Sequence, residues 1–163
     1  MHQLMRLFFS MICIVALSFF FVAASVAKGG DASGWEADSK YNGLYNPKER
    51  DSIKGTIVKL LKITPLPGMA PGTGFVLDEG GGDKVLVHVC PQSFASERET
   101  GLKRGDWVKI KGAWADIGDE TVFIAAKIKK DNDYSFKVRL TSDGTPFWTM
   151  PPEQLAKEQA ADD

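Results

Sequence analysis

The chain has 163 residues, of which 20 are Lys or Arg and 21 are Asp or Glu, so its formal net charge is −1. This length fits a single domain. The charge balance lacks the overall basic excess with which proteins attract nucleic-acid phosphates, so we do not expect nucleic acid as a partner.

The first 27 residues have the pattern of a cleavable signal peptide. Arg6 precedes an apolar run over residues 7–22, and Ser25 with Ala27, or Val22 with Ala24, stand where signal peptidase requires short side chains. We therefore predict export to the periplasm or another extracytoplasmic compartment, with no membrane span after cleavage. A retained anchor is the alternative, because the apolar run is close to spanning length. The mature chain keeps one cysteine, Cys90, so no internal disulfide holds the fold.

The mature chain begins with an N-terminal arm, residues 28–51, that shows no periodicity. A long first strand is predicted over 52–63, where Gly55 suggests a bulge or a tight bend. A loop rich in Pro and Gly leads to a second strand over 73–78, and three glycines turn the chain into a third strand over 84–89. Pro91 ends that strand.

A short helix is predicted over residues 92–102, followed by strands over 106–115 and 121–129. Three strands, one helix and two strands is the element order of an all-β, five-stranded OB-type barrel, which we place at residues 52–148. A further strand over 135–140 is added, and residues 149–163 are predicted to form a flexible C-terminal tail. An immunoglobulin-like sandwich would need about seven strands, and a small SH3-like barrel would lack the helical insertion.

Several local motifs resemble a group of exported bacterial OB-like small proteins. They are Pro67-Gly68-Met69 with Gly72, the run Val87-His88-Val89-Cys90-Pro91, Arg104-Gly105-Asp106, Val138-Arg139-Leu140, and Asp143-Gly144-Thr145-Pro146-Phe147-Trp148. The resemblance implies a periplasmic protein associated with cytochrome, respiratory or magnetosome systems. The group's usual residue at position 90 is glycine, so this chain departs from the pattern at Cys90.

An enzymatic function is not expected. His88 is the only histidine of the mature chain, and no Gly-x-Ser-x-Gly motif or comparable nucleophile turn accompanies it. His88 and Cys90 are two positions apart on a strand, so we expect their side chains to share a face with Cα atoms about 6.6 Å apart. The simpler interpretation is that both are structural residues at the barrel edge.

No cofactor is expected, but a metal or haem site is an open alternative. Met69, His88 and Cys90 are soft or borderline donors that could meet at one end of the barrel and hold copper, or supply an axial ligand to haem. Covalent haem attachment is excluded because the chain has no Cys-x-x-Cys-His motif.

The candidate binding surface combines aromatic and basic residues. Trp107, Lys109 and Lys111 are predicted on the outward face of one strand, and the next strand adds Phe123 with Lys127, Lys129 and Lys130. Pro146 and Trp148 form a second candidate contact, although their segment could instead cover the barrel mouth. These surfaces predict a non-catalytic binding module with an envelope or periplasmic protein partner, and the resemblance implies that it serves an envelope or electron-transfer assembly. The alternative for the basic stripe is an ordinary solvated sheet face.

Overall fold

The computed structural model describes residues 31–161, so the predicted signal peptide lies outside the described residues. Within this range no helix is long and apolar enough to cross a membrane. The strands are β1 (Arg50–Ile63), β2 (Gly72–Gly80), β3 (Asp83–Pro91), β4 (Trp107–Ile117), β5 (Glu120–Lys130) and β6 (Tyr134–Lys137). The helices are α1 (Pro152–Ala160) and the 3₁₀ turns η1 (Asn42–Leu44), η2 (Pro47–Glu49) and η3 (Phe147–Thr149).

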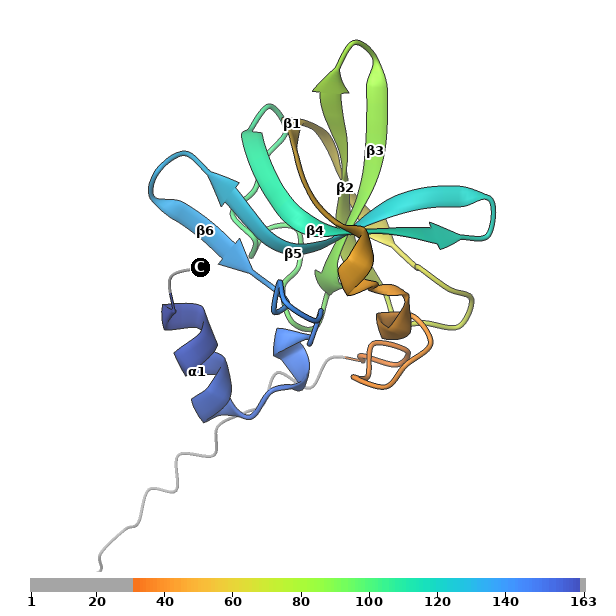
Figure 1. Ribbon diagram of the computed structural model, residues 1–163, viewed down its shortest axis with the longest axis vertical. Helices are drawn as coiled ribbons and strands as arrows, with labels where there is room; N and C mark the ends of the chain where they lie inside the picture. The colour runs from red at the N-terminus through yellow and green to blue at the C-terminus, as the bar shows by residue number, and fades with distance from the viewer. Residues whose placement is uncertain (1–30, 162–163) are drawn as a thin grey trace, which may run out of the picture.

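The six strands form one sheet in the order β3-β2-β1-β4-β5-β6, in which neighbours are antiparallel. The sheet curls so that β3 also meets β5 in parallel, through the pairs Val87↔Phe123 and His88↔Ile124. Closure is therefore partial, at a short β3–β5 seam (Figure 1). The mainly β, OB-like prediction is confirmed in this coarse form.

Strand β1 serves both halves of the sheet. Its first half, from Arg50, pairs with β4, and its second half, to Ile63, pairs with β2. Gly55 lies near the crossover, where an added Cβ would stand 2.2 Å from the carbonyl oxygen of Asp78. Glycine is therefore needed at position 55 for the two strands to approach, whereas the register shift between β1 and β2 lies at Val58.

The helix predicted over residues 92–102 is wrong. The segment forms two separate turns, closed by hydrogen bonds from Ala95 N to Pro91 O and from Thr100 N to Ser96 O. The helix does not continue because the Ala95 carbonyl instead accepts hydrogen bonds from Thr73 Oγ1 (2.7 Å) and Cys90 Sγ (3.5 Å). Ala95 and Leu102 are nevertheless buried, so the turns still contribute to the core.

Residues 31–161 form two hydrophobic clusters, one on each side of the curled sheet. The main core lies inside it and is built mainly from β1–β5. The second, which we call the arm cluster, joins Trp35, Tyr41 and Tyr45 of the N-terminal arm to the outer face of the sheet. The sheet residues of the arm cluster include Ala113, Val122, Ile124 and Ala126. The arm therefore covers the outer face along the β3–β5 seam.

The middle of β5, residues 122–128, is buried on both faces, which overturns the predicted exposure of Phe123. Phe123 is fully buried in the main core together with Ala125. The register with β4 passes from Lys111↔Lys127 to Gly112↔Ala125, which leaves Ala126 as the extra residue of a β-bulge. A bulge reverses the in–out alternation, so a strict period of two cannot predict the faces on both sides of it.

Candidate functional site

Lysines lie side by side on the outer face of β1, β4, β5 and β6. One row of cross-strand pairs is Lys54↔Lys109↔Lys129, and the next is Ser52↔Lys111↔Lys127↔Lys137. Directly paired residues share a face of the sheet, and neither row contains an acid. We use the name lysine face for the exposed members, Lys54, Lys109, Lys111 and Lys129, together with Trp107.

Trp107 lies at the β1–β4 edge of the lysine face, where it pairs with Thr56. Its side chain is 56% exposed, and it is the one exposed large hydrophobic residue within residues 31–161. It borders a hollow of about 430 Å³ whose other walls include Lys54 and Glu79. Trp107, Lys109 and Lys111 therefore come together as predicted, with an apolar group beside the cations.

The other end of the lysine rows is covered. Lys127 is 2% exposed and Lys137 is 8% exposed, so the predicted outward position of Lys127 does not make it accessible. Lys137 Nζ donates to the carbonyl of Glu158 (3.2 Å) and to that of Ala161, at the end of α1. An ammonium group is favourable there because the carbonyls of a helix C-terminus carry partial negative charge.

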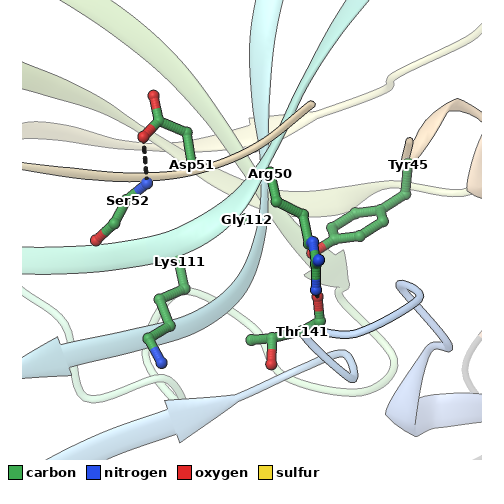
Figure 2. A pocket seen from close by; sticks show the side chains of 7 residues that line it. All are labelled: Tyr45, Arg50, Asp51, Ser52, Lys111, Gly112 and Thr141. Atoms are coloured by element: carbon green, nitrogen blue, oxygen red, sulfur yellow. Dashed lines mark hydrogen bonds between the residues drawn. The ribbon is translucent and has the colours of Figure 1, made fainter. Parts of the chain in front are cut away.

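A pocket of about 260 Å³ adjoins the lysine face at Lys111. Figure 2 shows its lining residues, which are Tyr45, Arg50, Asp51, Ser52, Lys111, Gly112 and Thr141. Arg50 is held by three carbonyls: Nε donates to Pro47 O (2.8 Å), and Nη1 to Thr141 O (3.3 Å) and Ser142 O (3.4 Å).

The one acid of this pocket is already engaged. The Asp51 carboxylate accepts from Ser52 N (2.7 Å) and from Trp114 Nε1 (3.1 Å). In Figure 2 it points away from the Lys111 ammonium and from Thr141. The pocket therefore contains the cationic groups of Arg50 and Lys111, and its one carboxylate points away from the Lys111 ammonium.

Pro146 and Trp148 lie away from the lysine face. Pro146 is buried, and Trp148 is half-buried with its Nε1 donating to Trp35 O (2.7 Å). The Trp148 ring lies 5.7 Å from that of Trp35 and 5.9 Å from that of Phe94. Their segment therefore acts as an internal cover, and Phe123, Pro146 and Trp148 do not join the exposed surface.

Sequence inspection overlooked Arg139 as a functional candidate. Its side chain is 1% exposed and donates from Nη1 to Asn42 Oδ1 (2.7 Å) and to Gly144 O (3.3 Å). Its Nε and Nη2 make no hydrogen bond with residues 31–161. Burial lowers the pKa of the guanidinium, opposed by Tyr41. The one available signal was an arginine set between the apolar residues Val138 and Leu140.

His88 is buried in the outer layer beneath the arm. It is 3% exposed, and its Nδ1 lies 3.1 Å from the Tyr41 hydroxyl. Burial lowers the pKa of His88 to about 4, and the charge of Arg139 lowers it further in the same direction. The imidazole is therefore neutral at physiological pH. It lines a hollow of about 170 Å³ with mainly apolar walls, including Ile63 and Leu86.

Cys90 faces the main core instead, so the predicted shared face with His88 is wrong. The register between β2 and β3 passes from Thr73↔Cys90 to Gly74↔His88, which makes Val89 a bulge residue and turns its neighbours to opposite faces. Cys90 is fully buried, and burial raises the pKa of its thiol to about 12.

Met69 packs in the arm cluster, and the three proposed donors do not form one set. Residues 31–161 contain no group of three or more His, Cys, Asp or Glu side chains arranged to hold a metal ion.

Comparison with known proteins gives one family match. The model of the MamS/MamX magnetosome protein family matches residues 49–135. No curated protein sequence matches the chain.

Similar solved structures include a chain of the Stn1–Ten1 complex of S. pombe, with 16% identity and a TM-score of 0.42 over 61% of this chain and 79% of that one. Another is the mitochondrial single-stranded DNA-binding protein Rim1 of S. cerevisiae, with 13% identity and a TM-score of 0.38 over 55% and 98% of the two chains.

Proposed function

Because this chain belongs to the MamS/MamX magnetosome protein family, we propose that it is an exported, non-catalytic accessory protein of a magnetosome, envelope or electron-transfer assembly. It binds a protein partner through the lysine face. The observation that carries this proposal is the grouping of Trp107 with four exposed lysines on the part of the outer sheet surface that the arm leaves open.

The composition of the lysine face supports protein binding. An exposed Trp is the kind of side chain that anchors interfaces, because it buries a large area with little loss of conformational freedom. Surrounding lysines steer an acidic partner and set its orientation. The chain as a whole is slightly acidic, so the positive charge on this face is local.

The burial of the reactive groups supports a non-catalytic role. A nucleophilic cysteine needs a lowered pKa and access to solvent, whereas the Cys90 thiol has a raised pKa and is fully buried. The neutral imidazole of His88 lies on the other side of the sheet and could not activate it.

The export part of the proposal is tested by intact-mass measurement of the protein recovered from its native envelope fraction. Cleavage after Ala27 gives a chain that begins at Lys28. A chain recovered with its apolar N-terminal run intact would contradict cleavage and favour the retained anchor.

Partner binding is tested with a photo-crosslinking residue at position 109 on the lysine face and, as the matched control, at position 84 on the β2–β3 hairpin. Both lysines are exposed. We expect position 109 to give a defined crosslinked protein that is lost when Lys54 and Lys111 are changed to Glu. Equal products from both positions, or products that survive the charge reversal, would refute binding by this face.

Metal or haem binding is a second candidate, resting on His88. Tyr41 engages Nδ1, which leaves Nε2 as the ring nitrogen available to a ligand in the adjoining hollow. Cys90 does not fit such a site because it faces the main core. Our first proposal predicts no equimolar copper, iron or zinc in the purified mature protein by elemental analysis. Equimolar metal that disappears in His88→Ala would favour the second candidate.

A further inference from the structure

We propose that the lysine face binds an extended acidic segment of its partner, and that one carboxylate of this segment enters the pocket between Arg50 and Lys111. A second carboxylate, two residues away, lies at Lys109, and an apolar side chain contacts Trp107. This inference rests on the proposed function, because it specifies the chemistry of the partner on the same face.

The size of the pocket limits what it can hold. Its volume is about 260 Å³, or roughly nine water molecules at about 30 Å³ each. Sites for whole small molecules and cofactors usually span about 300–1,000 Å³. The pocket is therefore below the usual size of a site for a whole cofactor, and it has room for the end of a side chain.

The charge of the pocket selects an anion. Arg50 is oriented by the carbonyls of Pro47, Thr141 and Ser142, and its Nη2 makes none of these bonds. The Lys111 ammonium has no hydrogen-bond or ion-pair partner within residues 31–161. Two cationic groups at one pocket attract a carboxylate, and charge-assisted hydrogen bonds to a carboxylate are among the stronger polar contacts in proteins.

The spacing along β4 selects an extended chain. Trp107, Lys109 and Lys111 are successive outward residues of one strand, so each lies about 6.6–6.8 Å from the next. Alternate residues of an extended partner segment have the same spacing. An apolar residue followed by two acids at alternate positions therefore meets Trp107, Lys109 and the Lys111 pocket in turn.

The cross-strand neighbours reinforce this match at Lys109. Lys54 and Lys129 flank it on β1 and β5, so the middle acid is surrounded by three ammonium groups. The hollow beside Trp107 provides room for the apolar side chain. Asp78 and Glu79 form the far wall of that hollow and would repel an acid placed there, which favours one direction of binding.

The test uses fluorescently labelled peptides and the mature chain, residues 28–163. The matching peptide carries Phe, Glu and Glu at alternate positions separated by serines. Three controls have the same length: one with adjacent glutamates, one with glutamates four residues apart in a helix-forming background, and one with phosphoserine in place of both glutamates. Binding is followed by fluorescence polarisation at an ionic strength of about 0.02 M, where surface charges are little screened.

We expect the matching peptide to bind about ten-fold more tightly than the adjacent and helical controls, and Lys111→Glu to weaken it by about ten-fold or more. Lys84→Glu makes the same charge change on an exposed lysine outside the face and should alter binding less than two-fold, about 0.4 kcal/mol. Lys111→Gln provides a milder variant, and thermal melts confirm that each protein is folded.

Equal binding of all the glutamate peptides would overturn the extended spacing, and equal binding to Lys111→Glu and wild type would overturn the pocket. Tighter binding of the phosphoserine peptide would overturn the choice of carboxylate. If crosslinking at position 109 depends on the lysines while the peptides do not discriminate, this inference fails and the proposed function stands. If the crosslinked product also survives the change of Lys54 and Lys111 to Glu, the proposed function fails as well.

Discussion

The guanidinium of Arg139 lies over the indole ring of Trp148, with 4.6 Å between Cζ and the ring centroid. Each of the two residues also bonds to the N-terminal arm: Arg139 Nη1 donates to Asn42 Oδ1, and Trp148 Nε1 donates to Trp35 O. The cation–π contact and these bonds tie the segment after β6 to the arm. The N-terminal arm and the segment after β6 therefore stabilise each other over the β3–β5 seam.

Asn42→Ala is expected to destabilise the protein by about 2 kcal/mol, because it removes the best hydrogen-bond acceptor of a buried guanidinium. The same amide also donates to the carbonyls of Trp35 (2.9 Å) and Glu36 (2.6 Å), so the substitution also removes two hydrogen bonds within the arm. Urea unfolding measures the change. Asn132→Ala, in the exposed β5–β6 turn, is the control and should stay within about 0.5 kcal/mol of wild type. Equal stability of the two variants would show that the arm is not held by Arg139.

Gly72→Ala is expected to displace the arm from the sheet. An added Cβ would stand 2.3 Å from Cζ2 of Trp35 and 3.0 Å from the carbonyl oxygen of Cys90. Trp35 is fully buried, so it cannot move without breaking its contacts with Tyr41 and Trp148. We expect a loss of about 1–3 kcal/mol in the free energy of unfolding.

Gly43→Ala serves as the control for this substitution, because a Cβ at Gly43 meets nothing within 4 Å. It should be neutral or slightly stabilising, since alanine restricts the unfolded chain. If Gly72→Ala were as stable as Gly43→Ala, the close packing of Trp35 on β2 would be refuted.

Local sequence patterns predicted most of the strands and the exposed group on β4. Alternation between apolar and polar residues located β4 well, because Val108 and Ile110 face the main core while Trp107 and Lys109 remain exposed. Gly55 marked a place where β1 and β2 approach each other closely, although the bulge of β1 lies at Val58. These features depend on neighbours along the chain, which a sequence shows directly.

The missed features depend on contacts between distant segments. The bulges at Val89 and Ala126 each reverse the in–out alternation of side chains. Strict alternation therefore assigned Cys90 and Phe123 to the wrong faces. The turns at 92–102 replace a helix because Thr73, from β2, binds the Ala95 carbonyl. The pocket at Arg50 and Lys111 joins residues 61 positions apart in the chain, and neither has a local pattern that predicts the other.

The buried imidazole of His88 should make stability depend on pH. Its pKa is about 4 in the folded protein and near 6.5 when unfolded, so between these values the unfolded chain binds more protons. The free energy of unfolding therefore falls as the pH falls from about 6.5 to 4, by up to about 3 kcal/mol in total. In His88→Gln this contribution disappears, and the curve between pH 5 and 7 should be flatter than that of wild type. Parallel curves for the two proteins would mean that His88 is accessible to protons in the native state.

The Cys90 thiol should be unreactive towards thiol reagents in the native protein. Its side chain is fully buried, and burial raises its pKa to about 12, so at pH 8 only about one thiol in 10⁴ is ionised. We expect no reaction of the mature chain with a disulfide reagent such as 5,5′-dithiobis(2-nitrobenzoic acid), and one reacting thiol per chain after unfolding in guanidinium chloride. Ser142→Cys adds a thiol at an exposed position and should react with one equivalent without denaturant.

The same burial excludes a disulfide between two native chains, because the sulfur atoms could not meet without opening the end of β3. Non-reducing electrophoresis should therefore show a monomer, even after exposure to an oxidant. Rapid native reaction of one thiol, or a dimer that collapses on reduction, would mean that β3 opens at Cys90. A buried, unreactive Cys90 cannot form a disulfide with the proposed partner, which is consistent with non-covalent binding through the exposed lysines and Trp107.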